Sequence, residues 1–135
     1  MCSVKPGDVL IAKVGDPPGI AAIYPSDQPA AIITQDVIRI RVAGERAIPE
    51  YIVGYLNSSR GRWKVAGVTI EATRARFSLG DFKGLKIELP PLPLQREFAK
   101  RIAAVEQLRS AHRASLGELD ALFAALQHRA FRGEL

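Results

Sequence analysis

Residues able to bind a metal ion or form a disulfide are scarce in this sequence of 135 residues. Cys2 is the only cysteine, which excludes an internal disulfide. The two histidines, His112 and His128, lie sixteen residues apart with no acidic or thiol ligand pattern beside them. We therefore expect no metal site, and no motif for any other cofactor is present.

Long apolar runs are also absent. No stretch approaches the roughly 20 uninterrupted apolar residues that span a membrane. The first ten residues, MCSVKPGDVL, have neither the basic leader nor the apolar run of a signal peptide. Apolar residues nevertheless make up 47% of the chain, which is enough for a packed core. We expect a soluble, cytoplasmic protein with one small domain, or one small domain and an appended helix.

Motifs for catalysis are missing too. There is no Gly-x-Ser-x-Gly elbow, no phosphate-binding glycine-rich loop and no His-Glu-x-x-His pair. A metal-dependent nuclease would need clustered carboxylates and a lysine. Lys86 and Glu88 share one face of a predicted strand, but a single pair of this kind is common on protein surfaces. We expect a non-catalytic protein with no catalytic residue. A small DNA-processing enzyme is the less favoured alternative.

Proline and glycine divide the chain at Pro90-Pro91-Leu92-Pro93. After this block there is no proline, and glycine occurs only at Gly117 and Gly133. We therefore place a small α+β domain over residues 1–93 and a helical region over residues 94–135. The overall prediction is an α+β fold, in which a small globular domain is followed by one long amphipathic coiled-coil helix.

The α+β prediction comes from short apolar segments separated by turn residues. One of them, 36–42, alternates Arg39 and Arg41 with apolar side chains, which places the arginines on one face. Pro49 suits the first turn of a short helix, and residues 79–82 resemble a turn or a single helical step. The predicted strands are 9–14, 20–24, 31–34, 36–42 and 85–89, and the predicted helix is 49–58.

Positive charge is concentrated in residues 57–76. The chain carries a net charge of +5, and this segment holds five basic residues against Glu71 alone. Such a cluster is typical of a protein that binds a polyanion, and a solvated basic loop is the equal alternative. Trp63, inside the cluster, is expected to anchor a core or an interface rather than to stack on bases.

Apolar residues recur every three or four positions from Leu94 to Ala130, as in an amphipathic helix. A continuous helix of this length would extend about 55 Å. A compact body of 93 residues has a radius of gyration of about 12–13 Å, so the helix needs a second helix to cover its stripe. A hairpin broken at Gly117 is the alternative, but no turn residues surround this glycine. The predicted pairing residues are Leu94, Phe98, Ile102, Val105, Leu108, Leu119, Leu122, Phe123 and Leu126.

The order of several motifs carries a resemblance to a known family. The chain contains Lys-Pro-Gly-Asp-Val-Leu-Ile-Ala-Lys-Val-Gly at 5–15, Tyr-Leu-Asn-Ser at 55–58 and Ala-Gly-Val-Thr at 66–69. Leu-Pro-Pro-Leu-Pro-Leu-Gln-Arg-Glu-Phe at 89–98 and Ala-Phe-Arg-Gly-Glu-Leu at 130–135 are the most specific. Together they resemble the specificity subunit of type I restriction–modification systems, over essentially the whole chain.

The resemblance implies a DNA-recognition role without catalysis. In that family an α+β target recognition domain reads one half of a bipartite DNA site. A long helix then pairs antiparallel with a second helix, and the modification subunits dock on this rod. A full subunit has two domains and two helices, whereas this chain has material for one helix and a partial domain. The segment that normally precedes the strand at residue 9 is missing, and if that segment completes the sheet, the edge left free would invite pairing with another chain.

The resemblance and the clustered charge together define the candidate DNA contacts. Arginine and lysine would bind phosphates or base edges, Thr69 could bond to either, and Gly67 would allow close approach of the backbone. The expected partners are double-stranded DNA, the modification (methyltransferase) and restriction subunits, and a second copy paired through antiparallel helices, which would favour an inverted-repeat target. The alternative is an interaction protein that pairs through its helix and does not bind DNA. The candidate DNA-binding residues are Lys13, Arg60, Arg62, Lys64, Thr69, Arg74 and Arg76.

Overall fold

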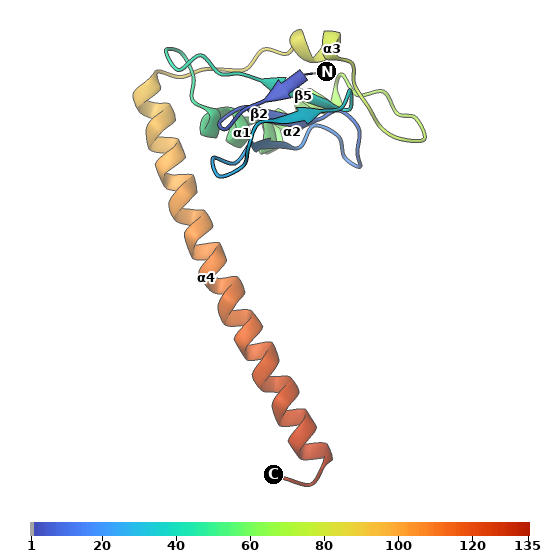
Figure 1. Ribbon diagram of the computed structural model, residues 1–135, viewed down its shortest axis with the longest axis vertical. Coiled ribbons are helices and arrows are strands. Elements are labelled where there is room, and N and C mark those ends of the chain that lie inside the picture. Colours follow the sequence, from blue (N-terminus) through green and yellow to red (C-terminus); the bar gives the residue numbers. More distant parts are fainter. Residues whose placement is uncertain (1) are drawn as a thin grey trace. The chain divides into compact units, whose positions relative to one another are not determined.

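The computed structural model describes residues 2–135 and confirms a small α+β domain followed by one long helix (Figure 1). The chain forms two compact units, Met1–Ala99 and Lys100–Leu135. The long helix α4 (Leu92–Phe131) crosses this division, so its first turns belong to the first unit. The sequence places the division after residue 93, whereas α4 begins at Leu92 and the two units divide after Ala99.

The strands of the first unit form two small antiparallel sheets. In the larger sheet, β2 (Val9–Ala12) lies between β3 (Ala21–Ile23) and β5 (Val37–Ile40). In the smaller sheet, β1 (Cys2–Val4) pairs with β4 (Ala31–Ile33). The predicted strands at 9–14, 20–24, 31–34 and 36–42 are thus present in shorter form, whereas β1 was not predicted.

The core lies between the larger sheet and the short helices α1 (Pro49–Asn57), α2 (Ser59–Ala66) and α3 (Leu79–Lys83). Val9 and Ile11 alternate along β2 and are fully buried, as the two-residue period of a strand requires. The helices and the loop before α3 add further buried apolar side chains. These are Ile52, Leu56, Val65, Phe77 and Phe82.

The outer edge of β3 is covered by a side chain. The Asn57 amide accepts a hydrogen bond from the Ala21 amide at 2.9 Å and donates one to the Ala21 carbonyl at 2.8 Å. These are the two bonds that a neighbouring strand would make, so Asn57 takes the place of a further strand here. The strand at residue 9, β2, has a neighbouring strand on each side and presents no free edge.

The predicted strand at 85–89 is wrong. This segment is extended but belongs to neither sheet. Its alternation is real, because Leu85 and Ile87 pack on the core while Lys86 and Glu88 are exposed. Side chains take the place of a partner strand: Lys64 donates to the Lys86 carbonyl at 2.6 Å, and Tyr51 donates to the Glu88 carbonyl at 2.8 Å.

The helix α4 is continuous through Gly117, which confirms the unbroken alternative over the hairpin. No atom lies within 4 Å of the position that a Cβ at Gly117 would occupy, so this glycine serves no close packing in the chain. The helix ends before Gly133, which adopts a φ of +71° and suits the residue after a helix. Among residues 2–135, no helix is both long enough and apolar enough to cross a membrane.

An ion pair between a buried carboxylate, Asp8, and a half-exposed arginine, Arg41, ties the turn before β2 to the end of β5. Asp8 is 3% exposed and accepts two hydrogen bonds from Arg41, at 2.8 and 2.7 Å. The Lys5 amide donates to the same carboxylate at 2.9 Å. The hydrogen bonds from Arg41 lower the pKa of Asp8 to about 2, against the opposing effect of burial.

Replacing this carboxylate should therefore cost stability in a pH-dependent way. We expect Asp8→Asn to lower the free energy of unfolding by about 1–3 kcal/mol at pH 7, since charge-assisted hydrogen bonds are lost. Because the folded-state pKa is depressed, the native contribution is complete above pH 4 and disappears as the pH falls towards 2. Urea unfolding of both proteins from pH 7 to pH 2 measures the difference. A difference that stays constant down to pH 2 would contradict this account.

The first turns of α4 are fixed to the first unit by one buried polar side chain. Gln95 is 0% exposed. Its Oε1 accepts from the Ile48 amide at 3.1 Å, and its Nε2 donates to the carbonyls of Arg46 and Pro90 at 3.0 and 2.7 Å. One amide thus satisfies buried backbone groups from two separate segments.

We expect Gln95→Ala to lower the free energy of unfolding by about 2–4 kcal/mol, because it leaves several buried backbone groups without partners. Amide hydrogen exchange should also become faster around Ile48 and in the first turns of α4. Gln107, exposed on the same helix, provides the control, and Gln107→Ala should change stability by less than about 0.5 kcal/mol. Equal effects of the two substitutions would show that the buried amide has no special role.

Candidate nucleic-acid interface

The first part of the basic segment forms a helix, α2, and Arg74 and Arg76 lie in the loop that follows this helix. Ser58 caps it, since its hydroxyl accepts from the Gly61 amide at 3.2 Å. A Cβ at Gly61 would lie 2.1 Å from the Tyr55 carbonyl oxygen, so only glycine allows α2 to lie so close to α1. Trp63 is 76% exposed on this helix, so it does not anchor the core. Its expected role as the anchor of an interface stays a prediction.

Arg60 and Lys64 lie one turn apart on α2 and both bind Glu88. Arg60 Nη2 is 2.8 Å and Lys64 Nζ is 3.0 Å from the same oxygen, Glu88 Oε1. The Tyr55 hydroxyl donates to the other oxygen, and Lys64 Nζ lies 5.6 Å from the centre of the Tyr55 ring. The hydrogen bonds from Tyr55, Lys64 and Arg60 lower the pKa of Glu88 to about 2. Two of the seven candidate DNA contacts are therefore bound to one carboxylate of the chain itself.

Arg62 and Thr69 line a different part of the surface. They border a cavity of about 230 Å³ together with Asp16, Pro17 and Glu71. The Arg62 Nη1 atom is buried and makes no hydrogen bond to residues 2–135. The Thr69 hydroxyl donates to the Val65 carbonyl at 2.8 Å, so its hydrogen is used at the end of α2 while its oxygen can still accept.

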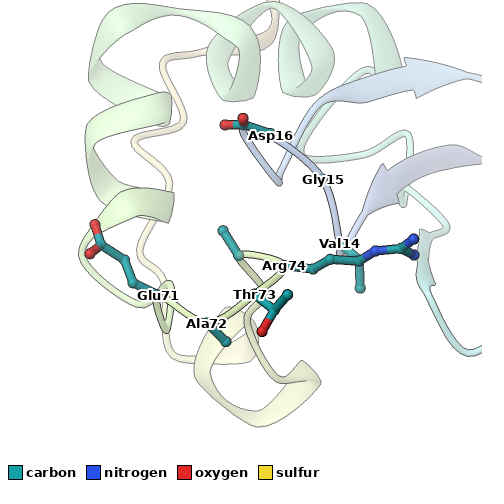
Figure 2. Close-up of a pocket in the computed structure, with 8 residues that line it drawn as sticks. Val14, Gly15, Asp16, Glu71, Ala72, Thr73 and Arg74 are labelled. Atoms are coloured by element: carbon teal, nitrogen blue, oxygen red, sulfur yellow. The ribbon is translucent and has the colours of Figure 1, made fainter.

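Arg74 and Arg76 lie in the loop that follows. The loop closes through two backbone hydrogen bonds between Ile70 and Arg76, at 2.7 and 3.2 Å, and Arg76 also bridges to Val14. Both arginines are exposed, and Arg74 borders a second hollow of about 590 Å³. Figure 2 shows the guanidinium of Arg74 extending past Val14, away from the carboxylates of Asp16 and Glu71.

Lys13 lies beyond the end of β2. Its ammonium donates to the Gln35 carbonyl at 2.9 Å, and its own carbonyl accepts from the Phe77 amide at 3.4 Å. The backbone thus connects Lys13 to the loop that carries Arg76. The structure brings Arg62, Thr69 and Arg74 around two hollows, and both hollows are also lined by Asp16 and Glu71. Arg60 and Lys64 lie apart from them and form, with Tyr55 and Glu88, what we call the Glu88 cluster.

The apolar stripe of the second unit has no cover within residues 2–135. Every residue from Lys100 to Leu135 is exposed, including the apolar positions. In the first unit, Leu94 is 60% exposed, whereas Phe98 packs edge-on against the Tyr51 ring at 5.6 Å between centroids. The exposed apolar residues of the second unit's stripe are Ile102, Val105, Leu108, Leu116, Leu119, Leu122, Phe123 and Leu126.

Sequence reasoning missed two residues that organise this surface. Glu88 was considered only as a partner of Lys86 on a strand face, and nothing local signals that it binds residues more than twenty positions away. Gln95 did carry a signal, because it lies three residues before Phe98 and seven before Ile102, on the apolar face of the helix. A polar side chain at such a position is expected to be buried and hydrogen-bonded.

Among residues 2–135, no group of three or more histidine, cysteine or acidic side chains is placed to hold a metal ion. The chain matches no protein-family model and none of the curated proteins.

Proposed function

We propose that this protein is a non-catalytic DNA-recognition half-subunit of the type I restriction–modification kind. It reads one DNA half-site through its α+β unit and pairs with a second copy through α4. It directs modification and restriction subunits to the target. The observation that carries the proposal is the apolar stripe on Lys100–Leu135, whose large side chains are 42–63% exposed between Ile102 and Leu126. The motif order described above supplies the DNA-recognition part.

Charge along the helix supports an antiparallel partner of the same sequence. Residues 100–113 carry four basic side chains and one acidic one, a balance of +3, whereas residues 114–131 carry Glu118, Asp120 and Arg129, a balance of −1. Antiparallel pairing of two copies places the basic half against the acidic half. Parallel pairing would place each half against its like.

The surface around Arg74 and Arg76 supports contact with DNA phosphates. Both side chains are exposed, and their loop is held by backbone hydrogen bonds to Ile70, Lys13 and Gly15, so they are presented from a fixed turn. Arginines on such turns position a protein on the duplex through its phosphates. Base reading would come from the neighbouring hollows, where Arg62 could donate, and Asp16 and Glu71 could accept.

A second function, a helix-paired interaction protein without DNA binding, is favoured by one observation. Arg60 and Lys64 are bound to Glu88, so the basic cluster displays less free charge than its composition implies. In this alternative α4 recruits its partner and the remaining cations are solvated.

DNA binding separates the two functions. The double variant Arg74→Gln/Arg76→Gln should bind a 30-base-pair duplex more weakly, and the slope of log affinity against log salt should become shallower by about two, since each phosphate contact contributes about 0.9. Arg129→Gln/Arg132→Gln removes the same charge from the end of α4 and should leave the slope unchanged. Titration by fluorescence anisotropy from 50 to 300 mM salt measures both. Absence of binding at any salt would favour the interaction-only function.

Pairing through α4 can be tested with one charge placed on or off the stripe. We expect the protein to sediment as a dimer at micromolar concentration, and Leu119→Asp to convert it to a monomer, because a carboxylate would enter the apolar seam. Ala121→Asp places the same charge on the opposite side of the helix and should leave the dimer intact. A monomer at every concentration of the unmodified protein would contradict pairing with a second copy.

A further inference from the structure

The Glu88 cluster is built like an anion site whose anion belongs to the chain itself. Arg60 and Lys64 are four residues apart, so they share one face of α2. Both cations contact one carboxylate oxygen, at 2.8 and 3.0 Å, and the Tyr55 hydroxyl donates to the other. Guanidinium, ammonium and phenol hydroxyl groups are also the donors with which proteins bind phosphate.

The carboxylate in this cluster is held at the surface. The Glu88 side chain is 51% exposed and Arg60 is 69% exposed, whereas in the Asp8–Arg41 pair the carboxylate is 4% exposed and the arginine 52%. Exposed ion pairs contribute little net stability, in contrast to a buried and bidentate pair. A phosphate that brings greater charge and more acceptor oxygens could therefore displace Glu88, but an external anion could not displace Asp8.

The segment that carries Glu88 does not depend on its carboxylate for its position. Lys64 also donates to the Lys86 carbonyl at 2.6 Å, and Tyr51 donates to the Glu88 carbonyl at 2.8 Å. Leu85 and Ile87 pack on the core from the same segment. The side chain of Glu88 can therefore leave the cations while the backbone stays in place.

We infer that Arg60, Lys64 and Tyr55 form a phosphate-binding site that Glu88 occupies in the free protein and yields to a nucleic-acid backbone phosphate. Glu88 thereby limits sequence-independent binding, because every phosphate that enters the site must displace it. The identity of the natural ligand as DNA rests on the proposed function, whereas the anion site itself does not.

The test removes the competing charge without changing its shape. We expect Glu88→Gln to bind a 15-base-pair duplex of arbitrary sequence about three- to tenfold more tightly at 50 mM salt, with a salt slope steeper by about one. Glu106→Gln is the matched control, since Glu106 is 54% exposed and also lies 2.8 Å from an arginine, Arg109. This control should change neither quantity. Adding Arg60→Gln and Lys64→Gln to Glu88→Gln should abolish the gain.

A second probe separates this inference from the proposed function. Tripolyphosphate, followed by isothermal titration calorimetry, should also bind Glu88→Gln at least threefold more tightly than the unmodified protein. A gain with tripolyphosphate supports the anion site even if the unmodified protein fails to bind DNA. If Glu88→Gln keeps its circular dichroism spectrum and gains no more than Glu106→Gln for either ligand, the cluster is purely structural and the inference is wrong. A gain that survives the loss of Arg60 and Lys64 would also overturn it.

Discussion

The buried amide of Gln95 determines how the long helix begins. Its three hydrogen bonds reach the Ile48 amide and the carbonyls of Arg46 and Pro90, which belong to two segments about forty residues apart. Without a partner, each of these buried backbone groups would cost about 1–3 kcal/mol. Phe98 then packs one turn further along, against Tyr51 and over Gly54, where a Cβ would approach the ring to 2.5 Å. The beginning of α4 is therefore part of the first unit's structure and not an attached tail.

The same helix changes character after Ala99. Gln95 and Phe98 contact the first unit before that point, and from Lys100 onwards every residue is exposed. Single exposed apolar residues are ordinary, but a stripe repeated over many turns is typical of a surface that pairs with another helix. Most of the stability of a helix in a protein comes from packing of its apolar face. Pairing in the second unit would supply packing that the chain lacks by itself.

Charge in the first unit shows why counting residues is a poor guide to a binding surface. Residues 57–76 contain five cations, yet two of them are bound to Glu88 and one has a nitrogen buried beside a cavity. Glu88 lies well outside this segment in sequence, so a local count of charge omits it. Arg74 and Arg76 remain exposed on a loop closed by backbone bonds. The electrostatic surface is thus decided by contacts between distant segments.

The sequence by itself determined the α+β class, four of the five strands and the long continuous helix, because the periods of two and of about 3.6 residues are local properties of the chain. It also determined the short helix beginning at Pro49. Only the tertiary structure decided that residues 85–89 join no sheet, since the side chains of Tyr51 and Lys64, and not a neighbouring strand, donate hydrogen bonds to carbonyl groups of this segment. Likewise, only long-range packing placed Asn57 on the edge of β3 and Glu88 between Arg60 and Lys64. Contacts between residues more than twenty positions apart leave no periodic trace, and for this reason the pairing of these side chains could not be predicted.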